Sequence, residues 1–575
     1  MKIRVYMSDW FYNMGIVGLV RILHDNNIEY KAAENYVEFD SQILENFANY
    51  YFDYFISTYI KKEYQRKIEI VENAKDYKAL EKVIDDISKK YKSLYGDERS
   101  KEIKKDLSNK KEDLEEKKKR ILNLLEDGKL KEKFAIDYTR SMMYDNFFGQ
   151  MGFLQKTLAS ASVQKHKEIF KEQFIIPLLE DIRIEEWVNG LIDKPDFLEN
   201  QNNDIAKKFK KFAKQKAKDG ATEVSLFKDF LEHNFEKCSV CDEHYCTSEK
   251  DIFDEVKFVP LGISQKSPNF FWNYNFSYPL CKVCKLVLLC TPAGVTPIST
   301  LTSIHYDEMK PADRREQTLL FVNSDSDIRT LIGLNDLIKE KIEGNVYQQL
   351  VMDIVERYKQ EAEWTLQNIL FVEFNAKYES KKAKLKYVHL PKYVAKFLIN
   401  RSIYVKNIYD YNTKEIFLSR IIYNGDLDEV IYKKLGQIVK EERKYDYDGY
   451  NMIISKTYLN MYRRGQENMG NAIEGKVKSA YKSGKEMRKV LQSNKEGNKI
   501  QTIAYKLLNA AKVGDKNLFL DSLMRLYISR KIEAPRIVLD MINENTVDFE
   551  TLAQSYIAGL MSDTSEKTEE ENNEN

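Results

Sequence analysis

The sequence predicts an α+β protein: a mixed N-terminal domain that carries a charged helical hairpin insertion, a cysteine-rich subdomain, and a C-terminal helical bundle. Three observations support this fold class. The N-terminus alternates like a strand and then follows a helical pattern, all six cysteines fall within residues 238–290, and apolar residues recur at helical spacing beyond Tyr447. With 575 residues, 43% of them apolar, the chain can form several compact units.

The first elements are a strand and a capped helix. Residues 3–7 alternate apolar and polar side chains, and Asp9 is placed to cap a helix that runs to about Leu23. Gly15 and Gly18 inside this helix predict close backbone approach to a neighbour, because an interior glycine costs about 1 kcal/mol against alanine. A second strand, YVEF, and an aromatic helix, ILENFANYYFDYFISTYI, follow within an N-terminal domain over residues 1–235.

Residues 61–133 are unusually polar. They contain 23 basic and 18 acidic residues in helical periodicity. We expect a charged helical hairpin that projects from the N-terminal domain without a core of its own. The alternative is an RNA- or protein-binding arm.

Two C-x-x-C pairs define the next region. Zinc takes four deprotonated ligands in a tetrahedron, and each pair delivers two sulfurs from one tight turn. The predicted ligands of a closed, structural Zn²⁺ site are Cys238, Cys241, Cys281 and Cys284. Ordinary buried thiols are the alternative, Cys246 or His244 could replace a ligand, and Cys290 is expected in the core.

The cysteine subdomain spans residues 236–300 and should be the least helical part of the chain. Six of the ten prolines lie between Pro260 and Pro311, and short strands and turns fit VKFVPLGI, NFFWNYNF and KLVLLC. The rest of the α+β body is expected over residues 301–447.

The C-terminal part predicts a helical bundle over residues 448–560 and a disordered acidic tail over 561–575. Residues 451–531 contain 17 basic but only 6 acidic residues. Cationic helix faces neutralise phosphates without reading base sequence. The predicted nucleic-acid-binding residues are Arg463, Arg464, Lys476, Lys478, Lys482, Lys485, Arg488 and Lys489. Solvated helix faces are the ordinary alternative.

Composition and motifs exclude several classes. The net charge is only +1, so no global field indicates a polyanionic partner. No apolar run long enough to span a membrane and no secretory signal pattern occur, so we expect a cytoplasmic protein whose clustered thiols bind metal rather than form disulfides. His24 and Asp25 form an HD pair without the further ligands of a phosphohydrolase, and no phosphate loop or nucleophile elbow is present. We expect no catalysis.

The sequence resembles the large subunit of the type I-B CRISPR Cascade, an RNA-guided DNA surveillance complex. The resemblance rests on YMSDWFYNMGIVGLVRIL, on CSVC and CKVC flanking SPNFFWNYNFSYPL, and on the helical C-terminus. It covers about half of the chain and implies partners: guide RNA with its 5′ handle, target double-stranded DNA, the Cascade backbone and handle-capping subunits, and a recruited helicase-nuclease. It also implies recognition of the short flanking motif (PAM), help in duplex opening, and stabilisation of the displaced strand.

Two finer expectations follow from the resemblance. Polar residues on the zinc-tied segment, Lys266, Asn269 and Asn273, are candidates for PAM reading because amides bond base edges. The bundle is similar to the Cascade small subunit, and an internal start could release it as a free protein. Met452, Met461 and Met469 all precede its helices, and Met469 is the favoured start.

Two other functions remain open at this stage. The chain could be a zinc-containing scaffold that binds only protein. It could also be a divergent metal-dependent nuclease, which turnover of labelled DNA with manganese would reveal.

Overall fold

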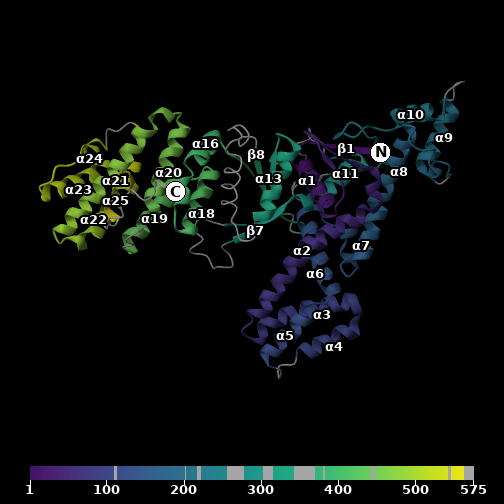
Figure 1. The fold of residues 1–575 in the computed structure, drawn as a ribbon, viewed down its shortest axis with the longest axis horizontal. Helices are drawn as coiled ribbons and strands as arrows, with labels where there is room; N and C mark the ends of the chain where they lie inside the picture. Colours follow the sequence, from purple (N-terminus) through teal and green to yellow (C-terminus); the bar gives the residue numbers. More distant parts are fainter. Residues whose placement is uncertain are drawn as a thin grey trace. The chain divides into compact units, whose positions relative to one another are not determined.

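The computed structural model describes residues 1–108, 113–200, 203–216, 222–254, 277–301, 315–341, 369–379, 382–441, 447–541 and 546–562. The protein divides into two compact units (Figure 1). The first takes Met1–Pro297, Gln317–Lys339 and Phe371–Tyr387, and the second takes mainly the described residues from Val388 onward. Within the described ranges no helix combines the length and apolar character needed to cross a membrane.

The first unit begins as the sequence predicts. Strand β1 (Lys2–Tyr6) pairs antiparallel with β3 (Tyr36–Asp40), which also pairs with β2 (Lys31–Ala32), in the order β1-β3-β2. Helix α1 (Trp10–Asp25) follows β1, and the Asp9 side chain caps it by accepting from the Phe11 and Tyr12 N–H groups. Nearly the whole of α1 is buried, so this helix forms the centre of the unit.

A group of helices packs around α2 (Phe47–Glu72), which itself contacts α1. These are α6 (Gly128–Met143) and α7 (Val163–Phe170). Tyr51 on α2 stacks on Phe170 with ring centroids 4.6 Å apart, and its hydroxyl donates to the Leu289 carbonyl at 2.9 Å. The aromatic helix predicted from the sequence therefore supplies core packing.

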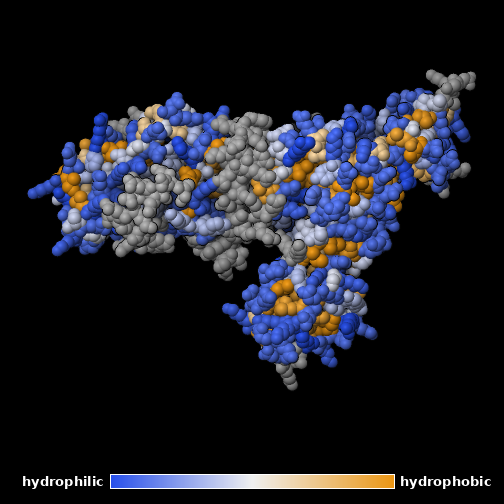
Figure 2. Space-filling model, viewed as in Figure 1, coloured by the Kyte–Doolittle hydropathy of each residue, from blue (hydrophilic) through white to orange (hydrophobic). Residues whose placement is uncertain are grey.

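The charged insertion is helical, as expected, but it is more than a hairpin. It contains α3 (Tyr77–Tyr95), α4 (Asp97–Leu107) and α5 (Leu114–Leu125), which pack with the ends of α2 and α6. The expectation that it lacks a core is wrong: Leu80, Ile87 and Leu107 are among a cluster of fully buried apolar residues. Few apolar residues suffice here because α3, α4 and α5 share this core with the ends of α2 and α6, while the charges cover an outer surface that is mostly blue in Figure 2.

A second lobe of the first unit consists of α8 (Ile176–Val188), α9 (Asp204–Lys216) and α10 (Glu223–Asn234). Trp187, Phe209, Phe227 and Phe230 form its core, and the partly buried Tyr245 packs against it. The cysteine region therefore continues directly from this lobe.

The cysteine region contains strands β4 (Ile252–Asp254) and β5 (Ser277–Pro279), followed by α11 (Lys282–Leu289) and α12 (Thr291–Gly294). The segment KLVLLC is thus helical, and its interpretation as a strand is wrong. A short apolar run is compatible with both a strand and a helix, because a segment that is buried on all sides shows no hydrophobic periodicity. The segments VKFVPLGI and NFFWNYNF lie at residues 256–263 and 269–276, outside the described residues.

A four-stranded sheet has the order β6-β7-β8-β9. Its strands are β6 (Thr296–Leu301), β7 (Arg315–Ser324), β8 (Ile369–Lys377) and β9 (Lys382–His389), and α13 (Ile328–Lys341) follows β7. Asn335 on α13 bonds both backbone groups of Val322, which fixes this helix on the sheet.

The second unit is helical. Its helices are α16 (Lys392–Arg401), α17 (Ile403–Lys406), α18 (Tyr411–Ile422), α19 (Leu427–Glu441), α20 (Asp448–Arg463), α21 (Gly470–Ser493), α22 (Ile500–Val513), α23 (Lys516–Ser529), α24 (Arg536–Asp540) and α25 (Phe549–Met561). Shorter 3₁₀ or π turns of the chain lie at Ser41–Asn46, Tyr144–Phe148, Gly152–Leu154, Lys156–Leu158, Lys171–Ile175, Asp196–Leu198, Glu467–Met469 and Gly497–Lys499.

Helices α21 and α25 cross at backbone distance in this unit. A Cβ on Gly484 would lie 2.1 Å from the Tyr556 carbonyl oxygen, and one on Gly559 would lie 1.9 Å from the Tyr481 carbonyl oxygen. Only glycine permits such an approach, so α21 has one face locked against α25 and the other free to carry charge.

Candidate metal centre and nucleic-acid surface

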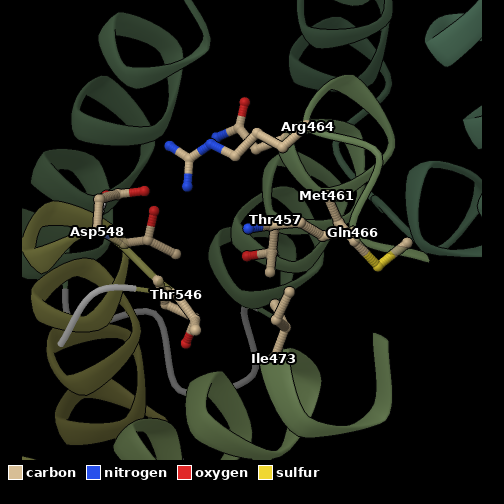
Figure 3. Close-up of a pocket in the computed structure, with 10 residues that line it drawn as sticks. Thr457, Met461, Arg464, Gln466, Ile473, Thr546 and Asp548 are labelled. Carbon is tan, nitrogen blue, oxygen red and sulfur yellow. Dashed lines mark hydrogen bonds between the residues drawn. The ribbon is translucent and has the colours of Figure 1, made fainter. Parts of the chain in front are cut away.

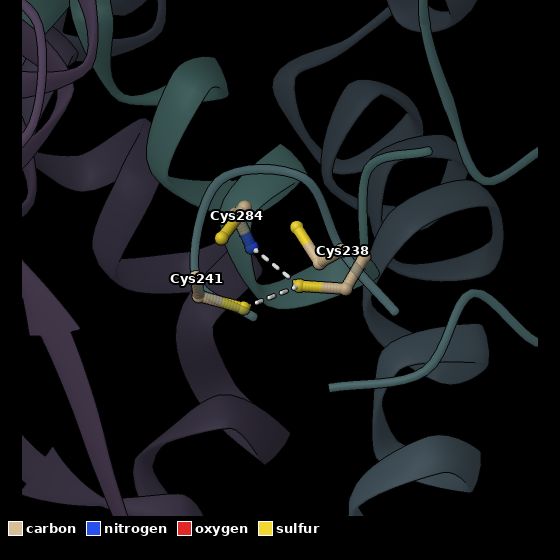
Figure 4. A group of neighbouring side chains, drawn as sticks. Cys238, Cys241 and Cys284 are labelled. Carbon is tan, nitrogen blue, oxygen red and sulfur yellow. Dashed lines mark hydrogen bonds between the residues drawn. The ribbon is translucent and has the colours of Figure 1, made fainter. Parts of the chain in front are cut away.

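The four predicted ligand cysteines converge on one point. Their Sγ atoms all lie within 4.8 Å of one another, and those of Cys241 and Cys281 are 3.8 Å apart (Figure 4). A tetrahedral site with Zn–S bonds of about 2.3 Å needs sulfurs separated by about 3.8 Å. The sulfur positions therefore fit a four-thiolate metal site, a ligand set that suits zinc or iron.

The first pair sits on a tight turn that leaves α10. Residues Lys237 and Tyr245 form an isolated antiparallel bridge, and the Cys238 N–H donates to the His244 carbonyl at 2.9 Å. Asp242 has φ of 54°, a left-handed conformation that reverses the chain directly after Cys241. This backbone places both sulfurs on one side of the turn.

The second pair opens a helix. Cys281 is the N-cap of α11, and its Sγ accepts from the Cys284 N–H at 3.4 Å. Backbone N–H groups and the positive end of the helix dipole favour a thiolate at this position.

Tyr12 connects this pair to α1. Its buried hydroxyl donates to Cys284 Sγ at 3.1 Å, and burial followed by the neighbouring Cys284 raises the pKa of Tyr12. The packing that allows this contact depends on glycine: a Cβ on Gly15 would lie 2.5 Å from the Val287 carbonyl oxygen, and one on Gly18 would lie 1.9 Å from that of Cys290. The predicted close approach of these glycines is confirmed, and its partners are α11 and α12.

The thiols perturb one another. The contact with Cys241, followed by those with Cys281 and Cys284, lowers the pKa of Cys238, whereas burial raises the pKa of Cys281. Such a cluster binds a cation most readily when all four sulfurs are deprotonated together.

The three remaining candidates lie outside the sulfur cluster. Cys246 is buried, and burial raises its pKa to about 12. The ring of His244 contacts Glu185, with Nδ1 2.7 Å from Oε1, and so it is not directed at the sulfurs. His244 contacts the site through its backbone carbonyl, which accepts from the Cys238 N–H. Cys290 is fully buried in the core, as expected, and donates to the Leu286 carbonyl.

A buried ion network stands behind the second pair. Lys282 Nζ contacts Asp181 at 2.6 Å, Asp251 at 2.9 Å and Thr247 at 2.7 Å. One ammonium cannot fully compensate two buried carboxylates, so burial raises the pKa of Asp181 to about 6 although Lys282 opposes this. Sequence reasoning missed this network because its members are up to 101 residues apart.

Four of the eight predicted nucleic-acid residues form a row on α21. Lys478, Lys482, Lys485 and Lys489 are spaced by four, three and four positions, which places them on one helix face. Three of them are exposed and Lys485 is half-buried. The opposite face holds buried Val477 and other residues that pack on α25. We call these four residues the α21 lysine row.

The other four predicted residues are placed differently. Arg463 bonds Tyr393 and Asn424, Lys476 Nζ donates to Thr546 at 2.7 Å, and Arg488 donates to the Leu560 carbonyl at 3.1 Å. These three side chains therefore hold parts of the second unit together.

Arg464 lines a small pocket in the second unit. Figure 3 shows its guanidinium extending across this pocket toward Asp548, with Thr457, Gln466 and Thr546 beside it. The side chain is exposed, so Arg464 lies at the rim of the pocket.

The three PAM-reading candidates Lys266, Asn269 and Asn273 lie outside the described residues, as does the predicted tail beyond Ser562.

The fold and this site define a mostly helical α+β protein with one cluster of four cysteines, among the described residues, that could hold a metal ion. Residues 232–296, which contain both C-x-x-C pairs, match the family model described as CRISPR-associated protein (Cas_CXXC_CXXC). This match indicates a CRISPR-associated protein. No curated protein and no solved structure matches the chain.

Proposed function

We propose that the protein is the non-catalytic large subunit of a type I-B CRISPR Cascade in the cytoplasm. The observation that carries this proposal is the match of residues 232–296 to a CRISPR-associated family, because the matched segment contains all four sulfurs of the candidate metal centre. The N-terminal resemblance, YMSDWFYNMGIVGLVRIL, runs from the end of β1 through most of α1, the helix that packs on α11, where the second cysteine pair lies.

In this proposal the metal is Zn²⁺ and its role is structural. Four thiolates fill a tetrahedral shell, which leaves no position for a substrate. The ion joins the lobe that ends at α10 to the core that contains α1 and α11. The zinc site thereby holds the segment between its two cysteine pairs by both ends.

The α21 lysine row supports the assignment of the second unit to nucleic-acid binding. Four ammonium groups on one helix face can each neutralise a phosphate and release its counterions, which gives affinity that depends on salt and not on base sequence. The expected ligand is the DNA strand displaced when guide RNA pairs with its target.

The finer parts of the proposal concern the segment between the cysteine pairs and the partners. Lys266, Asn269 and Asn273 would read the PAM in double-stranded DNA and help to open the duplex beside the guide 5′ handle. Other surfaces would contact the backbone and handle-capping subunits and the recruited helicase-nuclease.

The free small subunit belongs to the same proposal. Met469 ends the turn before α21, so translation from this codon would begin the product directly at the helix that carries the lysine row. Replacing this codon by a non-start codon should abolish a short C-terminal product. Recovery of that product with unchanged mass contradicts the choice of Met469.

Purification of the tagged chain from its native host tests the main proposal. Sequencing of the bound RNA should yield short RNAs that share a 5′ handle and are absent from an untagged control. An assembly without RNA, whose binding to DNA does not respond to sodium chloride, overturns the proposal. Protein partners without nucleic acid would favour the scaffold function, and cleavage of labelled DNA with manganese would favour the nuclease.

A further inference from the structure

Helix α9 in the first unit has a strongly basic composition that the charge total of the chain hides. Its sequence, DIAKKFKKFAKQK, contains six lysines and one acidic residue. All six lysines are exposed. They are Lys207, Lys208, Lys210, Lys211, Lys214 and Lys216.

The apolar side of α9 is already occupied. Ala206 and Phe209 are buried, and Phe212 and Ala213 pack against the lobe core formed with α8 and α10. Phe209 meets Phe227 edge to face, with ring centroids 4.7 Å apart. A helix that binds a bilayer inserts its apolar face, and α9 has none left to insert. Packing therefore fixes this helix with its lysines outward.

The lysines of α9 form a row along the exposed face. Lys207, Lys211 and Lys214 are separated by four and three positions, or by about 6 and 4.5 Å along the axis. Lys207 lies 3.8 Å from Asp204 at the start of the helix, and for Lys211 and Lys214 no ion pair is found among the described residues. The neighbouring α10 exposes one lysine, Lys228, and three acidic residues, Glu223, Asp229 and Glu232, so the excess of positive charge lies on α9.

We propose that the exposed lysine face of α9 binds the sugar-phosphate backbone of a nucleic acid, as a surface distinct from the α21 lysine row. This inference rests on the proposed function insofar as the protein meets nucleic acid at all. Because an aromatic core already fixes the backbone of α9, binding orders only the lysine side chains and not the helix itself. An extended strand with one charge per nucleotide complements such a row. In Figure 2 the outer end of the α9–α10 lobe is predominantly blue, as expected of a hydrophilic binding face.

The test uses the full chain with two charge-matched variants. One replaces four α9 residues, K207Q/K210Q/K211Q/K214Q. The control replaces four exposed lysines on the charged insertion, K82Q/K89Q/K101Q/K105Q, and removes the same net charge. Affinity is measured by fluorescence anisotropy over a sodium chloride series with labelled single-stranded DNA, single-stranded RNA and duplex DNA of one sequence. Circular dichroism confirms that both variants are folded.

We expect the α9 variant to lose about tenfold in affinity for at least one of the three probes at low salt. The slope of log affinity against log salt concentration should become smaller in magnitude by up to about 3, because each phosphate contact on a single strand contributes about 0.7. The control should stay within about twofold of wild type. The probe with the largest loss identifies the strand type that α9 holds.

Three results overturn the inference. The first is an α9 variant whose affinity equals that of the control for all three probes, while substitution of the α21 lysine row weakens binding. This result leaves the proposed function standing. The second is competition by polyglutamate as effective as that of nucleic acid at equal charge, which makes the ligand an acidic protein. The third is a wild-type chain that binds none of the probes, which removes the proposed function as well.

Discussion

Substitution of Gly18 by alanine tests the link between α1 and the metal centre. The new Cβ would lie 1.9 Å from the Cys290 carbonyl oxygen and 2.9 Å from the Gly294 backbone nitrogen. Both atoms belong to backbone, so no side-chain rotation can relieve the overlap. Since carbon and oxygen atoms rest about 3.3 Å apart at closest, α1 must move from α11 and α12 by about 1.4 Å.

A movement of this size has two consequences. It weakens the dispersion contacts along an interface of fully buried side chains, for which a gap of 0.5–1 Å already removes about a quarter to a half of the attraction. We expect the first unit to lose about 3 kcal/mol of stability, the upper part of the range for overpacked cores. It also lengthens the 3.1 Å contact of the Tyr12 hydroxyl with Cys284 beyond hydrogen-bonding distance.

Two measurements on the G18A variant check this reasoning. Urea unfolding gives the stability, and competition with a chromogenic chelator gives the retention of metal. G128A is the matched control in the same unit, because a Cβ at Gly128 meets nothing within 4 Å, and its stability should stay within about 0.5 kcal/mol of wild type. A G18A protein with wild-type stability and metal retention refutes the backbone-contact argument.

Three further predictions concern the site, the second unit and the response to pH. The Y12F variant should keep the fold but bind the metal about tenfold more weakly in chelator competition, since it loses a hydrogen bond to a ligand sulfur; unchanged affinity shows that the hydroxyl does not support the site. The K478Q/K482Q/K485Q/K489Q variant should lower the salt slope for single-stranded DNA by up to about 3, as measured by anisotropy, and an unchanged slope removes the α21 lysine row from the proposal. His166 is fully buried, and burial, followed by the nearby Arg140, lowers its pKa to about 4. Between pH 6.5 and 4, His166 is therefore protonated in the unfolded chain but stays neutral in the folded chain. The contribution of neutral His166 to the free energy of unfolding is complete above about pH 6.5 and decreases by about 3 kcal/mol as the pH falls to 4. Urea unfolding should show a smaller loss over this window for H166Q, and equal losses contradict the burial argument.

The sequence predicts local features well where one short segment determines them. Asp9 caps α1 through its own neighbours, and each C-x-x-C pair needs only a turn to bring its sulfurs together. The glycines of α1 indicated close packing because no local turn explains them. Their partners α11 and α12 could not be predicted, since they lie more than 260 residues away.

Features that depend on tertiary contacts were missed for physical reasons. The core of the charged insertion combines the few apolar side chains of α3, α4 and α5 with those at the ends of α2 and α6, and no single segment displays such a core. Charge counting also could not show that Arg463, Lys476 and Arg488 bond other parts of the second unit, namely Asn424, Thr546 and the Leu560 carbonyl. Counting charges along the chain also overlooked α9. Its six lysines are close in sequence to the acidic residues of α10, but the two groups lie on different helices.

The two cysteine pairs belong to two parts of the first unit, which also meet through the ion pair of Lys282 with Asp181. Cys238 and Cys241 follow α10 in the lobe whose outer helix is α9, whereas Cys281 and Cys284 open α11, which packs on α1 at backbone distance. An ion bonded to all four sulfurs would therefore tie the lobe that contains α9 to α11 and, through α11, to α1. In the proposed function, such an ion would therefore also help to fix the position of the basic face of α9 against a nucleic acid.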